Sequence, residues 1–256
     1  MRRPLLHSLP LLVLLALLPA CASQPAGEPE PAQKACATRG LSSEQELSLS
    51  LVQQREKDGQ LYAALAELQS LPESSPEVLR HKADILRRLG RPEAKSYFQR
   101  LQKTCMSAWA DHGLALIAAD AGDIATAQKL LQRAAQSLPT EYRLRNDLGV
   151  LLLREQKIDE ARFELMTALE LASDSSLPAV NLLTLLMVQQ KTPAMRSLMQ
   201  RYKMSASEWQ AAVQSCEDLV AFWGRQGTPS APSRQLCTVP APVSFPVAVG
   251  RKGETS

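Results

Sequence analysis

The stretch GLALIAADAGDIATAQKLLQRAAQSLP, residues 113–139, aligns without a gap to DLGVLLLREQKIDEARFELMTALELA, residues 147–172. Small residues and leucines recur at a spacing of 34, in the pairs Leu114 and Leu148, Ala115 and Gly149, Ala127 and Ala161, Leu131 and Leu165, and Ala134 and Ala168. Small residues at such places let two helices approach closely. A fixed period of this length predicts stacked helix pairs that bury a shared core.

Weaker copies flank these two units. An earlier unit with a shortened turn, and a degenerate first unit, are marked by Leu79, Ala83, Leu86, Gly90, Ala94, Phe98 and Leu101, and by Gly59, Ala64, Leu68 and Leu71. Downstream, residues 178–202 repeat the pattern, with Asn181 matching Asn146 and Ala194 matching Ala161 after a two-residue deletion in the turn. Five units predict about ten helices, enough for a continuous core.

This pattern of small and large apolar positions resembles the tetratricopeptide-repeat (TPR) family. The resemblance implies an all-α, right-handed superhelical solenoid of about five helix-turn-helix units. The composition agrees, since alanine and leucine dominate and aromatic residues make up only 4% of the chain. We assign the solenoid to residues 43–204.

A capping helix is expected over residues 205–224, because Ser205 and Glu208 match a capping box. The alternative is an amphipathic helix that binds a partner, with an outward apolar face formed by Trp209, Val213, Leu219 and Trp223. Residues 225–256 are rich in proline and serine and are expected to be mostly disordered.

The N-terminus has the layout of a signal peptide, expected over residues 1–20: two arginines, a short apolar run and small residues. Leu18-Pro19-Ala20-Cys21 resembles a bacterial lipobox, which implies lipidation of Cys21. Residues 21–42 would then form the lipidated N-terminus and a flexible tether. The alternative is ordinary secretion, with cleavage near Ala22 or Ser23. Because Ala22 is not aspartate, the resemblance implies an outer-membrane anchor facing the periplasm.

The charge balance argues against nucleic acid as a partner. The formal net charge is +3, and without Arg2 and Arg3 of the leader 27 basic residues face 26 acidic ones. Nucleic-acid binders usually carry a basic stripe and an alkaline pI.

Four cysteines remain besides Cys21, an even number that suggests disulfides in an exported chain. We favour Cys216 with Cys237, which would hold the proline-rich tail on the capping helix, and Cys36 with Cys105. The alternative is that some of them are buried free thiols.

The sequence predicts neither catalysis nor a cofactor. His81 and His112 lack a carboxylate or cysteine at helical spacing that would complete a metal site. Asp111 and His112 are neighbours in a helix and point about 100° apart, so they cannot act as a base and its orienting acid.

Family geometry implies that the first helix of each unit lines a concave groove that binds protein segments. The candidate groove residues are Arg80, Arg87, Arg88, Trp109, His112, Arg143, Asn146, Arg154 and Asn181, with Asp84, Leu116, Asp120, Val150, Leu153, Leu185 and Gln189 beside them. Arginine and asparagine side chains are suited to a peptide backbone or an acidic tail. Alternatively, these residues form a solvated inner face.

A lipobox, a tether and about five repeats, together with RLRNDLGVLLLR at residues 143–154 and its echo at Asn181, resemble the TadD family of Tad/Flp pilus lipoproteins. The resemblance implies an assembly scaffold with pilus or secretin components as partners. The alternatives are a pilotin-like lipoprotein for a type IV pilus or type II secretion secretin, and a scaffold that recruits peptidoglycan enzymes. The oligomeric state is not predicted.

Overall fold

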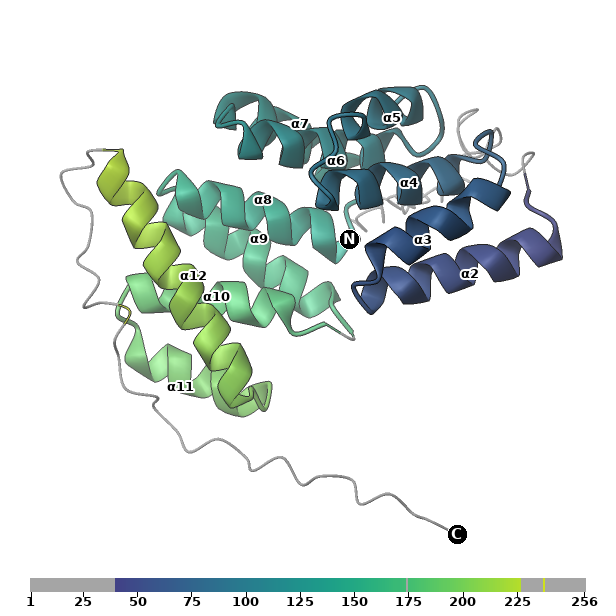
Figure 1. The fold of residues 1–256 in the computed structure, drawn as a ribbon. Coiled ribbons are helices and arrows are strands. Elements are labelled where there is room, and N and C mark those ends of the chain that lie inside the picture. Colours follow the sequence, from purple (N-terminus) through teal and green to yellow (C-terminus); the bar gives the residue numbers. More distant parts are fainter. Residues whose placement is uncertain (1–39, 174, 227–236, 238–256) are drawn as a thin grey trace, which may run out of the picture.

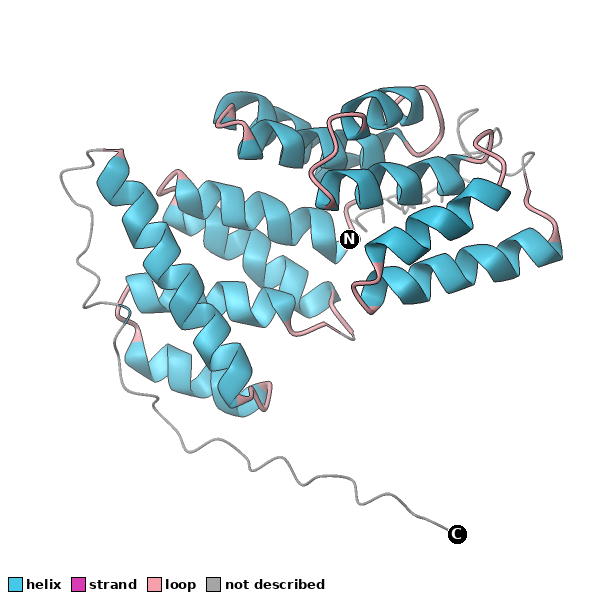
Figure 2. Ribbon diagram, viewed as in Figure 1, coloured by secondary structure: helices cyan, strands magenta, loops and turns pink. Residues whose placement is uncertain are grey.

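A computed structural model describes residues 40–173, 175–226 and 237. Within these ranges the chain forms eleven α-helices, one short 3-10 helix and no strand (Figures 1 and 2), which confirms the all-α prediction. The helices are α2 (Ser43–Lys57), α3 (Leu61–Glu67), η1 (Leu68–Ser70), α4 (Pro76–Arg88), α5 (Ala94–Leu101), α6 (Ser107–Asp120), α7 (Ile124–Ser137), α8 (Tyr142–Arg154), α9 (Ile158–Leu171), α10 (Leu177–Val188), α11 (Thr192–Arg201) and α12 (Ala206–Arg225).

The first ten helices form five consecutive pairs, α2/α3 to α10/α11, as the five predicted units require. We call the first helix of each pair the A helix and the second the B helix. Each B helix also packs on the next A helix, so neighbouring units share their core. In Figure 1 the pairs follow one another from α2/α3 to α10/α11.

The turn between A and B helices repeats with the period of the sequence. Gly122, Gln156 and Gln190 are each 34 residues apart and all have left-handed φ angles, of 81°, 60° and 55°. In each turn the next backbone N–H donates to a carbonyl five residues earlier, as in Asp123 to Ala118 and Lys157 to Leu152. Only the first of these turns has glycine, the residue that adopts this conformation without strain.

One predicted match in the fifth unit is wrong. Because Gln190 lies 34 residues after Gln156, the turn is not shortened, and the residue equivalent to Ala161 is Met195. Met195 is fully buried, whereas Ala194 is exposed. A methionine stands where the other core units have a small residue, because the long, unbranched side chain can fill an irregular gap between helices. α11 is also shorter than α7 and α9, with 10 residues where each of those has 14.

The final helix, α12, closes the C-terminal end of the fold. Ser205 and Glu208 form the predicted capping box, and the helix runs to Arg225. α12 packs mainly on α10 and reaches α8, so it crosses the A helices of the last two units (Figure 1). Trp209, Leu219 and Trp223 are buried in this contact, and Val213 is partly buried. The alternative of an outward apolar face is therefore wrong.

The structure contains a disulfide between Cys216 of α12 and Cys237, the pairing that the sequence analysis favours. Cys105 is also disulfide-bonded, and Cys36, its expected partner, lies outside the described residues. The predicted signal peptide, Cys21 and nearly all of the tether lie outside them too, as does most of the predicted tail. No helix in the part that the structure describes has the length and apolar character to cross a membrane.

Glu73 connects α4 with α5 in the second unit through two ion pairs. These ion pairs predict that the stability of the fold decreases in acid. The Glu73 carboxylate pairs with Lys82 and with Arg100, at 2.9 Å, and these partners lower its pKa from 4.5 to about 2. A lowered pKa stabilises the fold fully above pH 4.5, and this contribution is lost as the pH falls towards 2. More than a third of the side chain is exposed, so solvent screening keeps the effect to about 1 kcal/mol.

We expect Glu73→Gln to reduce stability at pH 7 and to match the unchanged protein at pH 2. Urea unfolding across pH 2–7 measures this difference. Glu67→Gln is the control, since Glu67 of α3 forms no ion pair with the described residues. A constant difference across this pH range would contradict the assignment.

Candidate protein-binding site

The A helices together form one face of the solenoid, which we call the A-helix face. Two pockets lie on it, and between them they contain all but Asn146 of the nine main candidate groove residues. The first, the basic pocket, lies among α2, α4, α6 and the start of α8. The second, the C-terminal pocket, lies among α8, α10 and α12.

The basic pocket has a volume of about 480 Å³ and an excess of positive charge. Five basic residues line it against two acidic ones: Lys57, Arg80, Arg87, Arg88 and Arg143 against Glu56 and Asp84. Arg88 reaches across to the backbone oxygen of Glu56 at 3.3 and 3.4 Å, and so connects α4 with α2. The remaining positive charge suits an anionic ligand.

Two of the arginines in this pocket have unused donors. The Nε atoms of Arg80 and Arg87 are buried and have no hydrogen-bond partner among the described residues. Burial raises the pKa of the nearby Asp84 carboxyl above its usual range, although Arg80, His112 and Arg87 act in the opposite direction. Arg80 Nη1 lies 3.8 Å from the Asp84 carboxylate, so this aspartate balances part of the positive charge of the pocket.

His81 forms the buried wall of this pocket. Its Nδ1 lies 2.7 Å from the Glu56 carboxylate, and its Nε2 lies near Arg80 and Gln53, at 2.9 and 3.3 Å. These contacts bind α4 to α2, so His81 has a structural role here.

A series of contacts, which we call the polar ladder, connects the two pockets along the A helices. Arg80 lies over the Trp109 ring, 5.2 Å from its centroid, and Trp109 meets His112 edge-on. His112 Nε2 lies 2.6 Å from the Asp147 carboxylate. The ladder ends where Asn146 donates to Asp147 at 3.0 Å and Asn181 donates to Asn146 at 2.7 Å. It therefore runs from α4 through α6 and α8 to α10.

The structure corrects the role expected for Asn146. Only 1% of this residue is exposed, and its amide is used by Asp147 and Asn181. Asn146 therefore positions its neighbours and does not contact a partner. Leu185 is buried as well, because this side of α10 lies in the core.

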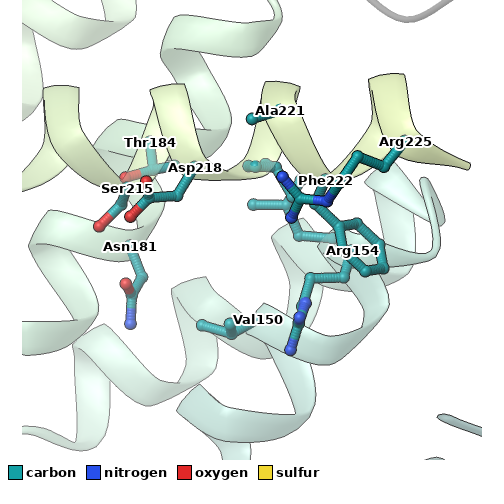
Figure 3. A pocket seen from close by; sticks show the side chains of 11 residues that line it. Val150, Arg154, Asn181, Thr184, Ser215, Asp218, Ala221, Phe222 and Arg225 are labelled. Carbon is teal, nitrogen blue, oxygen red and sulfur yellow. The ribbon is translucent and has the colours of Figure 1, made fainter. Parts of the chain in front are cut away.

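The C-terminal pocket has a volume of about 400 Å³ and two different ends (Figure 3). Arg154 and Arg225 lie at the end near Phe222, where the Arg154 guanidinium is 4.6 Å from the ring centroid. Ser215 and Asp218 lie at the opposite end. Apolar side chains of Val150, Leu153 and Leu219 line the space.

Several residues of the site were missed by the sequence analysis. Asp147 lies 35 residues after His112, one more than the repeat period, so an alignment of the repeats pairs His112 with Asn146 and misses Asp147. Glu56 and Gln53 lie in the degenerate first unit, where the pattern is weak. Phe222 and Arg225 belong to α12, whose packing across α8 and α10 no repeat pattern indicates.

Asp111 and His112 point to different partners, as the helical geometry predicts. Asp111 is buried and pairs with Arg133, while His112 pairs with Asp147. No cluster of three or more metal-ligating side chains occurs among the residues that the structure describes.

This architecture, five helix pairs with a pocketed inner face, defines a repeat scaffold. The sequence profile described as Tetratricopeptide repeat matches residues 118–186. TPR repeat-containing protein PA4299 of Pseudomonas aeruginosa is 42% identical over 216 residues, which cover 84% of this chain and 85% of that protein. The chain therefore belongs to the tetratricopeptide-repeat family, a family of scaffold proteins.

A solved structure shares the fold. PilF of Pseudomonas aeruginosa superimposes with a TM-score of 0.52 and 15% identity, over 73% of this chain and 93% of that one. MamA of Desulfovibrio magneticus RS-1 has a TM-score of 0.42 and 14% identity, over 75% of this chain and all of that one.

Proposed function

We propose that the A-helix face binds an extended segment of a protein partner, so that the chain acts as an assembly scaffold. The basic pocket carries this proposal. Its arginines keep buried N–H donors without partners, and a peptide carbonyl or carboxylate would satisfy them. The pocket also opens beside Trp109, whose indole ring offers a flat apolar surface to a bound side chain.

We further propose that the scaffold serves a Tad/Flp pilus or a related secretion apparatus, held at the outer membrane by a lipid on Cys21 and facing the periplasm. The lipobox-like Leu18-Pro19-Ala20-Cys21 and the TadD-like stretch at 143–154 support this role. That stretch spans α8, which contributes Arg143 to the basic pocket and Arg154 to the C-terminal pocket. The Cys216–Cys237 disulfide is compatible with an oxidising compartment such as the periplasm.

Crosslinking and affinity capture of the lipoprotein from cells test both proposals. We expect pilus or secretin components to be recovered, and Arg87→Glu to reduce their yield by about tenfold, since a reversed charge repels an anionic segment. Arg91→Glu is the matched control, because Arg91 lies in the exposed turn after α4, outside the basic pocket.

The outcomes separate the parts of the proposal. Equal capture by the Arg87→Glu and Arg91→Glu variants would contradict binding at the basic pocket. Recovery of peptidoglycan enzymes alone, together with normal pilus assembly after deletion of the protein, would refute the pilus role. A Cys21→Ser variant that remains at the outer membrane would exclude the lipid anchor.

A further inference from the structure

A groove outside the A-helix face lies between the B helices α9 and α11, with α10 as its floor. α10 packs against both of these helices, and Figure 1 shows it between them. The groove, which we call the B-helix groove, has a volume of about 680 Å³. It shares no lining residue with the basic pocket or the C-terminal pocket. Its apolar lining residues are Met166, Leu169, Leu182, Leu186, Ala194, Leu198 and Tyr202.

Two large apolar side chains are exposed on α9, and we call them the α9 ridge. Met166 is 46% exposed and lines the B-helix groove. Phe163, one turn earlier in the helix, is 64% exposed and lies on the other side of α9, towards α7 and α8. An exposed apolar ridge beside an apolar groove is typical of a surface that contacts another protein.

The two helices that border the groove carry opposite charges. α9 contains four acidic residues and one arginine, whereas α11 contains two arginines and no acidic residue, with Lys191 directly before it. Glu160 of α9 is exposed and forms no ion pair with the described residues, and the same is true of Lys191 and Arg201 beside the groove. A complementary partner is therefore a helix with an apolar ridge and acidic side chains, and α9 itself has both properties.

From this complementarity we infer that two copies of the chain associate through α9, with the α9 ridge of each copy in the B-helix groove of the other. A two-fold axis parallel to α9 makes the contact reciprocal. The two Met166 side chains then meet at the axis, and Phe163 and Glu160 face α11 of the second copy. Glu160 and Lys191 lie at the starts of α9 and α11, which are one repeat apart and run in the same direction. Each Glu160 is therefore placed opposite Lys191 of the second copy.

This contact is small and closed. Each groove receives the ridge of the other copy, so two copies associate and leave no groove for a third. The contact involves little more than one helix and one groove from each copy, so we expect a weak dimer with a dissociation constant of about 10–100 μM. The inference goes beyond the proposed function, because the A-helix face of each copy stays free to bind a partner.

Sedimentation equilibrium tests the dimer on the disulfide-bonded chain from residue 21 onward, carrying Cys21→Ser. We expect monomers at about 1 μM and mainly dimers above about 200 μM. Met166→Asp should weaken the dimer by about tenfold or more, because it places a charge in an apolar contact. Leu47→Asp is the matched control, since Leu47 is a 65% exposed apolar residue of α2, outside the groove.

An exchange of charges identifies a second copy as the occupant of the groove. Glu160→Lys and Lys191→Glu should each weaken the dimer by about tenfold, because like charges then face each other at both contacts. An equimolar mixture of the two variants restores opposite charges at both contacts, and so does the double variant. Both should return to within about threefold of the unchanged dissociation constant. Lys95→Glu is the matched control, since Lys95 is an exposed lysine of α5 without an ion pair to the described residues.

Each alternative outcome would overturn a defined part of the inference. A monomer at every concentration up to about 500 μM would show that a second copy does not occupy the groove. Equal weakening by Met166→Asp and Leu47→Asp would contradict the contact through α9, and a mixture that stays monomeric would contradict the pairing of α9 with α11. Complexes larger than two copies would exclude the closed arrangement. Circular dichroism checks that the variants are folded, as expected for exposed positions.

Discussion

Gly113→Ala is expected to lower the free energy of unfolding by about 1–3 kcal/mol, although alanine favours helices. Gly113 lies in α6 with the ring of Phe98 from α5 directly against it. A Cβ atom there would lie 2.1 Å from two ring carbons of Phe98, far inside van der Waals contact. Phe98 is fully buried, so its ring cannot move aside without displacing the core of the second unit.

Urea unfolding followed by circular dichroism measures this loss. Gly224→Ala in α12 is the control, since no atom lies within 4 Å of the added carbon, and it should be neutral or stabilising. Adding Phe98→Leu to the Gly113→Ala variant should recover part of the lost stability, because the added Cβ clashes with the aromatic ring. Equal stability of Gly113→Ala and the unchanged chain would show that the units are not packed this closely.

Trp223→Ala is expected to cost about 3–5 kcal/mol and to release α12 from the repeats. Trp223 is 4% exposed, and its indole N–H donates to the backbone oxygen of Arg154 at 2.8 Å. Arg154 is the last residue of α8, where a carbonyl has no partner within its own helix. The tryptophan therefore fills space beside α8 and also satisfies its C-terminus.

Hydrogen exchange along α12 measures the release, together with the unfolding free energy. Trp223→Phe separates the two contributions, because it keeps most of the apolar volume and removes only the hydrogen bond, with an expected cost of about 1–3 kcal/mol. Phe163→Ala is the control, since Phe163 is 64% exposed and should change stability little. If α12 exchanges equally in Trp223→Ala and Phe163→Ala, the indole does not hold it.

The repeat core was predictable because close helix packing constrains residue size at fixed spacing. Gly149 illustrates this: its added Cβ would meet the Leu165 side chain at 2.7 Å, so a small residue opposite a leucine is required in this unit. The same rule wrongly predicted Ala194 as the small buried residue of the fifth unit. In the structure Met195 occupies that buried position. Size rules describe a preference, and a flexible side chain can satisfy the site in another way.

The sequence predicted on which face the candidate site residues lie, but it did not predict their contacts with one another. Family geometry places Arg80, Arg87 and Arg154 on the A-helix face, as the structure has them. It does not show that Asn146 is buried and bonded to Asn181, nor that His112 pairs with Asp147, because these contacts join different helices.

The sequence by itself determined the helix pairs, their number and the face that carries the arginines, since all of these follow from a period of 34 residues. Only the tertiary structure decided where α12 lies. Its apolar residues are compatible with several directions, and the choice is made by the fit of Trp223 to the end of α8 and by burial against α10. Because α12 packs there, the A-helix face has a pocket at its C-terminal end.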